Sequence, residues 1–372
     1  MSVIDYKYSK ILDEVLFKGF KYEDPNRKGV SRKQITSANV RFDFKDGFPI
    51  ISLRKIYYKG AINELICFLN GYTDVKEYWK RGVNFWDKDV AKFNNISIEE
   101  LKNGGSTYMG LIYPHQWRNG ESDQIMNLIY KMIHNPMSTE LIVNSWDYSN
   151  LKNMCLPPCH YSFQVVCFPV DDTYEFELHW AQRSTDLFLG FPTNIIFYSV
   201  LCKLLEVFTG YKARAVCADL KNVHLYDNQM SAAIEISTDR YFGRYNSPTF
   251  RITESLTNTF EGFKEEIKSL SFQSFSILIG HILEDLTEDM FIVEDYESYP
   301  PIKVEMLSYS ETATFKKGDR VNHPAHGEGV ITYKRECGHP YPFIVEFKTI
   351  MRSFTLDGRE RKEENPTLTK SL

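Results

Sequence analysis

Three strand-like stretches followed by one long apolar helix occupy the middle of the chain, and this order restricts the fold more than any other feature. Residues 140–145, 160–168 and 174–180 have the residue pattern of strands. Residues 192–210 are apolar, with a proline near the start and a glycine at the end, which predicts a long helix. Strands and helices in this order indicate an α/β (α+β) core.

Further elements are expected on either side of this region. Helical spacing of apolar side chains predicts three helices, at 7–19, 59–71 and 122–134. Residues 40–53 alternate like a strand around Asp46-Gly47. The polar segment 92–106 has the composition of a surface insertion.

The chain changes character after about residue 308. Residues 315–356 have the pattern of short strands with Gly and Pro turns, and 357–372 are a polar tail. We therefore expect two domains, an α/β domain at 1–308 and a small β-barrel with its tail at 309–372.

Composition excludes several classes of protein. Hydrophobic residues make up 43% and aromatic residues 15%, which argues against a disordered chain. A formal net charge of -5 gives no general attraction to nucleic acid. The N-terminus is too polar for a signal peptide, and we expect no apolar run of the roughly 20 residues that span a membrane. Seven cysteines, an odd number, indicate reduced thiols and a cytoplasmic protein.

The stretch 155–194 carries the most chemistry. Cys159 follows two prolines, which would hold its thiol in place, and Arg183 with Ser184 could bind an anion. Asp186 and Asn194 flank an apolar turn. A guanidinium near a thiol can lower the thiol pKa and so create a nucleophile. For these residues alone, a buried structural cysteine and a surface arginine remain the simpler interpretation.

A series of ordered blocks, however, resembles the thymidylate synthase family over roughly the first 300 residues. The matching blocks, in family order, are Arg27, RFDFKDGFPIISLRK (41–55), NELICFLNG (63–71), FWD (85–87), YPHQWR (113–118), LPPCH (156–160), QRSTDLFLGFPTN (182–194), VHLYDNQ (223–229) and YPPIKVEM (299–306). So many blocks in order are far more specific than one motif. The resemblance implies a large mixed sheet with packed helices, and a homodimer formed through the sheet face.

The resemblance also implies a reaction and a role for each matching residue. Cys159 would attack carbon 6 of a uracil ring, and carbon 5 would then take the one-carbon unit of 5,10-methylenetetrahydrofolate. The other residues matched to catalysis are Glu64, Tyr113, Asn194 and Asp186. Those matched to the nucleotide are Arg27, Arg183, Ser184, Gln182, His224 and Tyr226. Positions matched to the folate side are Trp86, Asp89, Leu189, Gly190 and Thr193.

Some of these residues have simpler interpretations. Trp86 and Tyr113 could be core, and His160 is expected to be a hydrogen-bonded core histidine. Glu64 lies in an apolar helix, where an unpaired carboxylate is costly, so a functional role is favoured. Cys155 precedes Cys159 by four residues without a partnering cluster, so we expect no metal.

Three departures from the family pattern bear on the product. Thr139 and Glu140 replace two arginines that bind the substrate phosphate of the partner subunit. Asp89 and Thr193 replace a Trp and a Phe, as in the hydroxymethylase branch of the family.

A more polar site favours addition of water over transfer of hydride, so the leading interpretation is a deoxyuridylate hydroxymethylase. Asn194 suits uracil, whereas an Asp would favour cytosine. Such enzymes serve phages that replace thymine, so the expected location is the cytoplasm, and that of the host if the protein is phage-encoded. The alternatives are a thymidylate synthase and a retired, nucleotide-binding member of the family.

The chain extends beyond the point at which the family pattern ends. YPPIKVEM resembles the family's closing segment, but the chain continues to residue 372. FKKGDRVNHPAHGEGVITYK (315–334) and FIVEFK (343–348) resemble a small Tudor-like barrel. Such a barrel would be a packing appendage or an extension of the dimer, or it would dock a protein or nucleic acid. Its candidate zinc ligands, His323, His326, Cys337 and His339, fit no standard spacing, so zinc is not expected.

Overall fold

The computed structural model describes residues 2–23, 30–120, 122–240, 244–304, 320–323, 326–334, 343–348, 351–354 and 369–370. The chain divides into two units, one made of residues 1–22 and 30–306 and the other of residues 23–29 and 307–372. Each unit is described by itself.

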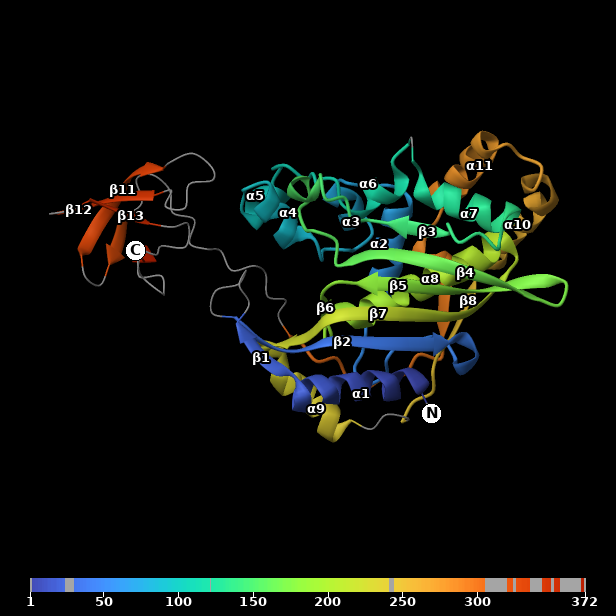
Figure 1. The fold of residues 1–372 in the computed structure, drawn as a ribbon, viewed down its shortest axis with the longest axis horizontal. Coiled ribbons are helices and arrows are strands. Elements are labelled where there is room, and N and C mark those ends of the chain that lie inside the picture. Colours follow the sequence, from blue (N-terminus) through green and yellow to red (C-terminus); the bar gives the residue numbers. More distant parts are fainter. Residues whose placement is uncertain are drawn as a thin grey trace. The chain divides into compact units, whose positions relative to one another are not determined.

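A seven-stranded mixed sheet forms the centre of the larger unit. Its order is β1 (Phe20–Glu23), β2 (Ser31–Asp43), β7 (Lys212–Tyr226), β5 (Thr173–Gln182), β4 (His160–Val170) and β3 (Ile142–Asn144), with β6 (Thr185–Asp186) also paired to β7. Strand β7 runs parallel to β5 and β6 but antiparallel to β2. Figure 1 shows β2, β7, β5 and β4 side by side. The large mixed sheet predicted from the family resemblance is therefore confirmed.

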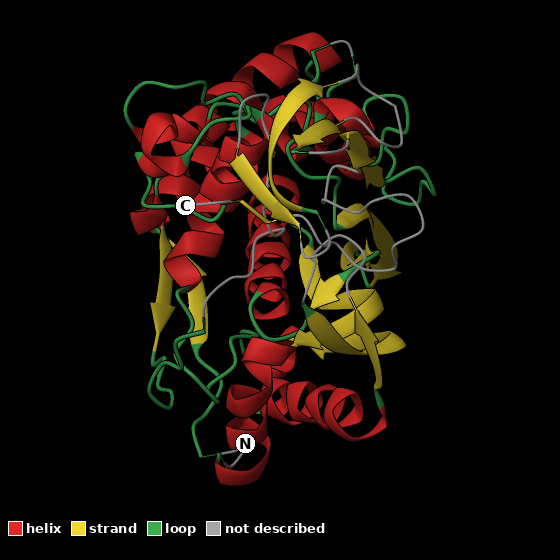
Figure 2. Cartoon of the chain, turned by 90° about the vertical axis from the view of Figure 1, so that its left-hand side faces the viewer, coloured by secondary structure: helices red, strands yellow, loops and turns green. Residues whose placement is uncertain are grey.

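Alternation along the strands decides which face of the sheet is buried. In β5, Phe176, Leu178 and Trp180 are buried, whereas Glu177 and His179 between them are more exposed. Because successive side chains point to opposite faces, β5 turns an apolar face toward the helices and a polar face away from them. Figure 2 colours the chain by secondary structure and shows helices packed beside the strands.

Helices pack against this sheet, and four of them, at Val3–Lys18, Tyr58–Leu69, Gln124–His134 and Gly190–Thr209, correspond to the four helices predicted from the sequence. The bounds of the helices are α1 (Val3–Lys18), α2 (Tyr58–Leu69), α3 (Val75–Trp79), α4 (Asp87–Phe93), α5 (Ile98–Lys102), α6 (Tyr113–Arg118), α7 (Gln124–His134), α8 (Gly190–Thr209), α9 (Met230–Asp239), α10 (Glu254–Ile267) and α11 (Phe272–Glu284). Short 3-10 turns lie at Phe44–Asp46, Leu151–Asn153, Asp227–Gln229 and Glu288–Met290. A separate two-stranded sheet pairs β8 (Thr249–Ile252) with β9 (Phe291–Glu294).

Helix α8 is the central core helix. It ends at Gly210, which adopts a left-handed conformation with φ 72° and donates its N–H to the carbonyl of Glu206. The expectation that no run is long and apolar enough to span a membrane is wrong for α8 by length and composition. However, 72% of the apolar stretch is buried inside the protein, as in the core helix of a soluble protein.

One local prediction needs correction, and one polar segment contains a helix that was not predicted. The strand expected at 40–53 ends at Asp43, because the chain turns through Phe44–Asp46 and Gly47 takes φ 101°. The segment 92–106 contains α5, which begins with a capping box between Ser97 and Glu100. Apolar spacing could not predict this helix, because Leu101 is its one buried residue.

The smaller unit contains an antiparallel sheet. Its order is β13 (Met351–Phe354), β12 (Phe343–Phe347), β11 (Gly327–Lys334), β10 (Arg320–His323) and β14 (Thr369–Lys370). The predicted C-terminal strands are confirmed, and β14 shows that part of the expected polar tail joins this sheet. Closure of the sheet into a barrel stays a prediction, and the predicted domain boundary at 308 lies outside the described residues. So do Cys337 and His339, whereas the rings of His323 and His326 stack with centroids 4.4 Å apart.

Candidate functional site

Cys159 directly precedes β4, and its backbone contacts Tyr113, the first residue of α6. The backbone N–H of Cys159 donates to the hydroxyl of Tyr113, with N···O 2.5 Å. Tyr113 is buried, and burial raises the pKa of its hydroxyl well above the ordinary value. The predicted residues Cys159 and Tyr113 are therefore in direct contact, with the phenol protonated at neutral pH.

Arg183 connects the end of β5 to the prolines before the thiol. Its Nε donates to the carbonyl of Pro158 and its Nη2 to that of Pro157, both at 2.8 Å. Its backbone N–H donates to the carbonyl of Cys159 at 2.8 Å. The guanidinium lies over the Trp146 ring, 5.5 Å from the centroid. A positive charge is therefore held next to the Cys159 loop, half-exposed.

Glu64 projects from α2 into an aromatic cluster. The indole N–H of Trp86 donates to Glu64 Oε1 at 2.8 Å. Burial raises the pKa of Glu64 to about 7, and the bond from Trp86 opposes that rise. The rings of Trp86 and Tyr113 have centroids 6.1 Å apart. A carboxyl group that titrates near neutral pH therefore belongs to the same cluster as Tyr113.

His160 is a core histidine, as predicted. Its Nδ1 lies 2.7 Å from the hydroxyl of Tyr198, and its ring stacks on Tyr113 with centroids 4.3 Å apart. Burial lowers the pKa of His160 to about 3. The imidazole is therefore neutral at physiological pH.

The amides of Gln182 and Asn194 meet between β5 and the first turn of α8. Asn194 Nδ2 donates to Gln182 Oε1 at 3.2 Å, and Gln182 Nε2 donates to the carbonyl of Ser184 at 3.0 Å. Three of the predicted site residues are thus linked by hydrogen bonds. Gln182 is buried, whereas Asn194 and Ser184 are half-exposed and accessible to a ligand.

Asp186 lies on β6, opposite His224 on β7. Its Oδ1 accepts the backbone N–H groups of Phe188 and Leu189 at 3.0 and 2.8 Å. Gln229 Nε2 donates to both carboxylate oxygens, and Gln229 Oε1 accepts the N–H of Tyr226 at 3.0 Å. Gln229 therefore connects two predicted site residues, Asp186 and Tyr226.

Sequence reasoning assigned no role to Gln229 or to Asn222. His224 Nδ1 lies 2.6 Å from the carbonyl of Asn222, and Asn222 Nδ2 donates to the carbonyl of Arg183 at 2.9 Å. Asn222 has φ 47°, a left-handed conformation that asparagine tolerates better than most residues. Gln229 is the last residue of the matching block VHLYDNQ. Its place in that block was the feature of the sequence that could have identified it as a site residue.

The positions that depart from the family pattern lie on α4, α8 and the turn before β3. Burial, and to a smaller degree the charge of Asp89, raise the pKa of the thiol of Cys155, the residue before the LPPCH segment. Thr193 Oγ1 donates to the carbonyl of Leu189 at 3.3 Å, one helical turn back past Gly190. Glu140 is exposed and pairs with Lys131 at 2.7 Å.

Thr139 is also exposed, and its carbonyl accepts a hydrogen bond from the Gln164 side chain. Arg27 lies outside the described residues.

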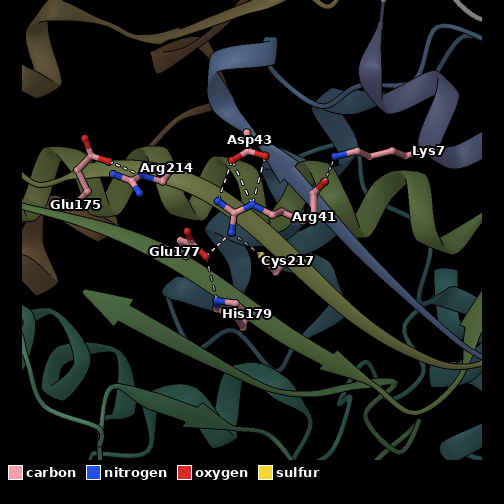
Figure 3. A network of polar contacts seen from close by, with 8 residues as sticks. All are labelled: Lys7, Arg41, Asp43, Glu175, Glu177, His179, Arg214 and Cys217. Atoms are coloured by element: carbon pink, nitrogen blue, oxygen red, sulfur yellow. Dashed lines mark hydrogen bonds and ion pairs between the residues drawn. The ribbon is translucent and has the colours of Figure 1, made fainter. Parts of the chain in front are cut away.

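A second polar network lies on the outer face of the sheet, away from these residues. Arg41 Nη1 donates to Glu177 at 2.5 Å and Nη2 to Asp43 at 2.8 Å, and Figure 3 shows Arg41 between the two carboxylates. Glu177, His179 and Cys217 have ligand atoms close enough together to hold a metal ion. Arg41, however, already neutralises Glu177 and lowers its pKa, which disfavours a cation there.

Comparisons with known proteins agree with the order of the blocks. The thymidylate synthase family model matches residues 6–308. The thymidylate synthase of Malacoplasma penetrans is 32% identical over 293 residues, covering 74% of this chain and 99% of the relative.

Two other relatives are similar to the same degree. The thymidylate synthase of Brachyspira hyodysenteriae is 30% identical over 306 residues, covering 80% of this chain and 98% of the relative. A probable thymidylate synthase of Escherichia phage T5 is 33% identical over 234 residues, covering 62% of this chain and 81% of the relative. With most of the chain matched by the family model, the protein belongs to the thymidylate synthase family of transferases.

Proposed function

We propose that the protein hydroxymethylates carbon 5 of deoxyuridylate. Folate-dependent transfer of a one-carbon unit to that carbon is the chemistry of the family. The observation that favours hydroxymethyl as the product is the polar pair Asp89 and Thr193, which replaces two aromatic residues. The charge of Asp89 acts on Cys155, the residue before the LPPCH segment, and Thr193 directly precedes Asn194 on α8.

Cys159 is proposed as the nucleophile that adds to carbon 6 of the pyrimidine. Addition to carbon 6 makes carbon 5 nucleophilic, and elimination of the thiol later restores the ring. Arg183 places a positive charge beside the Cys159 loop, which favours the thiolate and an anionic substrate. The contact of Tyr113 with the Cys159 backbone supports a role for this phenol near the reacting carbon atoms.

Glu64 is proposed to move protons through water during the reaction. A general acid–base group works best when its pKa is near the operating pH, and burial brings the Glu64 pKa to about 7. The indole of Trp86 donates to Oε1, and Oε2 is the oxygen proposed to exchange protons with water.

The residues around Asp186 suit the pterin ring of a folate. Asp186 Oδ1 accepts two backbone N–H groups, whereas Gln229 is the donor seen for Oδ2, so this half-buried carboxylate can accept further N–H groups from a ring. Leu189, Gly190 and the flat indole of Trp86 would line the same region. When bound, the folate supplies the one-carbon unit and, for a methyl product, also the hydride.

The choice between water and hydride depends on how dry the site is. An aromatic wall would exclude water from the one-carbon unit on carbon 5. Asp89 brings a charge and Thr193 a hydroxyl to this region, and both attract water. Addition of water would leave a hydroxymethyl group on the pyrimidine and release tetrahydrofolate.

The nucleotide is proposed to be recognised at three places. Asn194 would contact the uracil edge, and His224 with Tyr226 the sugar hydroxyl. Arg183, Ser184 and Arg27 would bind the phosphate. Because Thr139 and Glu140 add no positive charge, the phosphate would be held more weakly than by an arginine pair.

Thymidylate synthase activity is the second candidate. It is favoured by the names of the relatives, which are 30–33% identical to this chain. The two reactions differ in both products, so one incubation can separate them.

The test is incubation with deoxyuridylate and methylenetetrahydrofolate, with mass analysis of the nucleotide and an assay for dihydrofolate. Hydroxymethyl-deoxyuridylate with tetrahydrofolate supports the proposal. A methyl product with stoichiometric dihydrofolate replaces it with thymidylate synthase. The Cys159→Ser variant is the control and should form neither product.

We also propose that the protein is a homodimer formed through the outer face of the sheet. Ile142 and Val166 lie on neighbouring strands with 50% and 46% of their surface exposed, although both are apolar. Burial against a second copy would remove this apolar surface from water. Light scattering at micromolar concentration should give the mass of two chains; a single-chain mass would contradict the proposal.

A further inference from the structure

We propose that Trp180 is a positioning residue that decides which pyrimidine the site accepts. This inference rests on the proposed role of Asn194 in reading the base. Trp180 itself lies one layer behind Asn194 and acts through Gln182.

The indole of Trp180 is fixed in the core. Trp180 is 1% exposed, and its ring stacks on Tyr198 with centroids 5.0 Å apart and on Phe191 with centroids 6.4 Å apart. Its Nε1–H donates to Gln182 Oε1 at 3.2 Å, from two residues earlier on the same face of β5. An indole nitrogen can only donate, so Gln182 must present its oxygen to Trp180.

Gln182 is consequently held in one amide orientation. Its Oε1 accepts from both Trp180 and Asn194, while its Nε2 donates to the carbonyl of Ser184. A rotation of the amide by half a turn would place an NH₂ group against the Trp180 N–H and an oxygen against the Ser184 carbonyl. Both of these contacts are unfavourable in a side chain that is 2% exposed.

The orientation of Gln182 then determines the orientation of Asn194. Because Asn194 meets an oxygen, it must turn its Nδ2 toward Gln182, and its Oδ1 lies on the opposite branch of the amide. If Gln182 presented its NH₂ group instead, Asn194 would turn its Oδ1 toward it. The donor and acceptor of Asn194 would then exchange places.

This exchange matters because uracil and cytosine have opposite hydrogen-bonding patterns. Uracil has a donor at N3 and an acceptor at position 4, whereas cytosine has an acceptor at N3 and a donor at position 4. One orientation of Asn194 matches uracil and the other matches cytosine. Trp180 therefore fixes the uracil pattern although it does not itself contact the base.

The test is the ratio of kcat/KM for deoxyuridylate to kcat/KM for deoxycytidylate in Trp180→Phe. Phenylalanine retains the ring stacking but has no N–H donor. We expect the ratio to fall about tenfold, the upper range for one buried neutral hydrogen bond. Trp117→Phe is the matched control, because Trp117 is equally buried and donates to Ser145 at 2.7 Å. Its ratio should stay at the native value.

Two further variants distinguish positioning from loss of packing. Trp180→His keeps a ring N–H and should retain more of the ratio than Trp180→Phe. In a Gln182→Glu background, Trp180→Phe should change the ratio no further, because a carboxylate presents an oxygen in either orientation. The proposal would be overturned if folded Trp180→Phe kept the native ratio. It would also be overturned if Trp180→Phe lowered the ratio equally in the native and the Gln182→Glu backgrounds.

The same variants separate this inference from the proposed function. If the native protein converts neither nucleotide, the proposed function fails, and the ratio of the two dissociation constants, measured calorimetrically, replaces the ratio of kcat/KM. A shift of that binding ratio in Trp180→Phe supports the inference, and an unchanged binding ratio overturns it. If Trp180→Phe does not fold, Trp180→Leu, which also lacks an N–H donor, replaces it under the same criterion.

Discussion

The indole N–H of Trp86 donates to Glu64 Oε1 over 2.8 Å inside the aromatic cluster of α2, α4 and α6. This neutral donor satisfies one oxygen of the carboxyl group but brings no positive charge. Burial therefore has the larger effect and raises the Glu64 pKa to about 7. Glu64 is consequently predicted to control how both stability and activity depend on pH.

The folded protein should lose stability as pH rises from about 4.5 to about 7. Its Glu64 binds a proton more tightly than the unfolded chain, whose ordinary pKa is 4.5. The loss contributed by this group is at most about 3 kcal/mol. Urea unfolding of Glu64→Gln across this range should show a correspondingly flatter pH dependence. The same slope in both proteins would show that the Glu64 carboxyl is not protonated in the folded state.

Replacing the nucleophile should separate binding from chemistry. Cys159→Ser should lose turnover by at least about 1000-fold, because a hydroxyl is a far weaker nucleophile than a thiolate. It should also form no covalent complex with 5-fluorodeoxyuridylate, observed by mass spectrometry of the intact protein. Deoxyuridylate binding should persist, because the contacts of Arg183 to Pro157 and Pro158 do not involve the thiol. Cys167→Ser, on β4, is the control and should retain the covalent complex.

Gln229 should support folate binding through its hydrogen bonds to Asp186. Gln229→Leu removes the donor to Asp186 and the acceptor for the Tyr226 N–H, both of which are buried or half-buried. We expect KM for the folate to rise about tenfold and the free energy of unfolding to fall by about 1–3 kcal/mol. Gln124→Leu on α7 removes a more distant amide and should leave KM unchanged. If KM is unaffected in Gln229→Leu, Asp186 is held well enough by the backbone N–H groups alone.

The polarity of the site should decide the product. Asp89→Trp combined with Thr193→Phe should move product from hydroxymethyl toward methyl, with a matching rise in dihydrofolate. The measurement is the ratio of the two nucleotides, and each single variant should give an intermediate ratio. An unchanged ratio in a folded, active double variant would mean that these two positions do not control water. Asp87→Asn, a change of charge on the same helix α4, is the control.

Helices and strands with a regular pattern of apolar residues could be predicted from the sequence. Helices α2, α7 and α8 follow apolar spacing, and strands β4 and β5 were expected within a few residues of their observed bounds. Within the site, the link between Gln182, Ser184 and Asn194 lies inside one matching block. The elements depend on residues near each other in the chain, so their patterns were sufficient to predict them. The resemblance selected Gln182, Ser184 and Asn194 one by one, but their hydrogen bonds to one another were not predicted.

Contacts between distant segments could not be predicted in the same way. Gln229 reaches Asp186 only because β6 pairs with β7, and Asn222 meets Gln34 only because β2 pairs with β7. In the sequence, Trp180 looks like an ordinary apolar core residue of a strand. Only the structure shows that its indole N–H donates to Gln182. The burial that raises the Glu64 pKa likewise depends on the packing of several helices.

The pairing of β2 with β7 also has a consequence for synthesis of the protein. Strand β2 ends at Asp43, but its partner runs from Lys212 to Tyr226, so the N-terminal strand has no neighbour on that side until more than half of the chain has left the ribosome. Contacts of such large sequence separation form late and slow folding. A nascent chain stalled before Lys212 should therefore be sensitive to protease within Ser31–Asp43, and one that extends past Tyr226 should become resistant there.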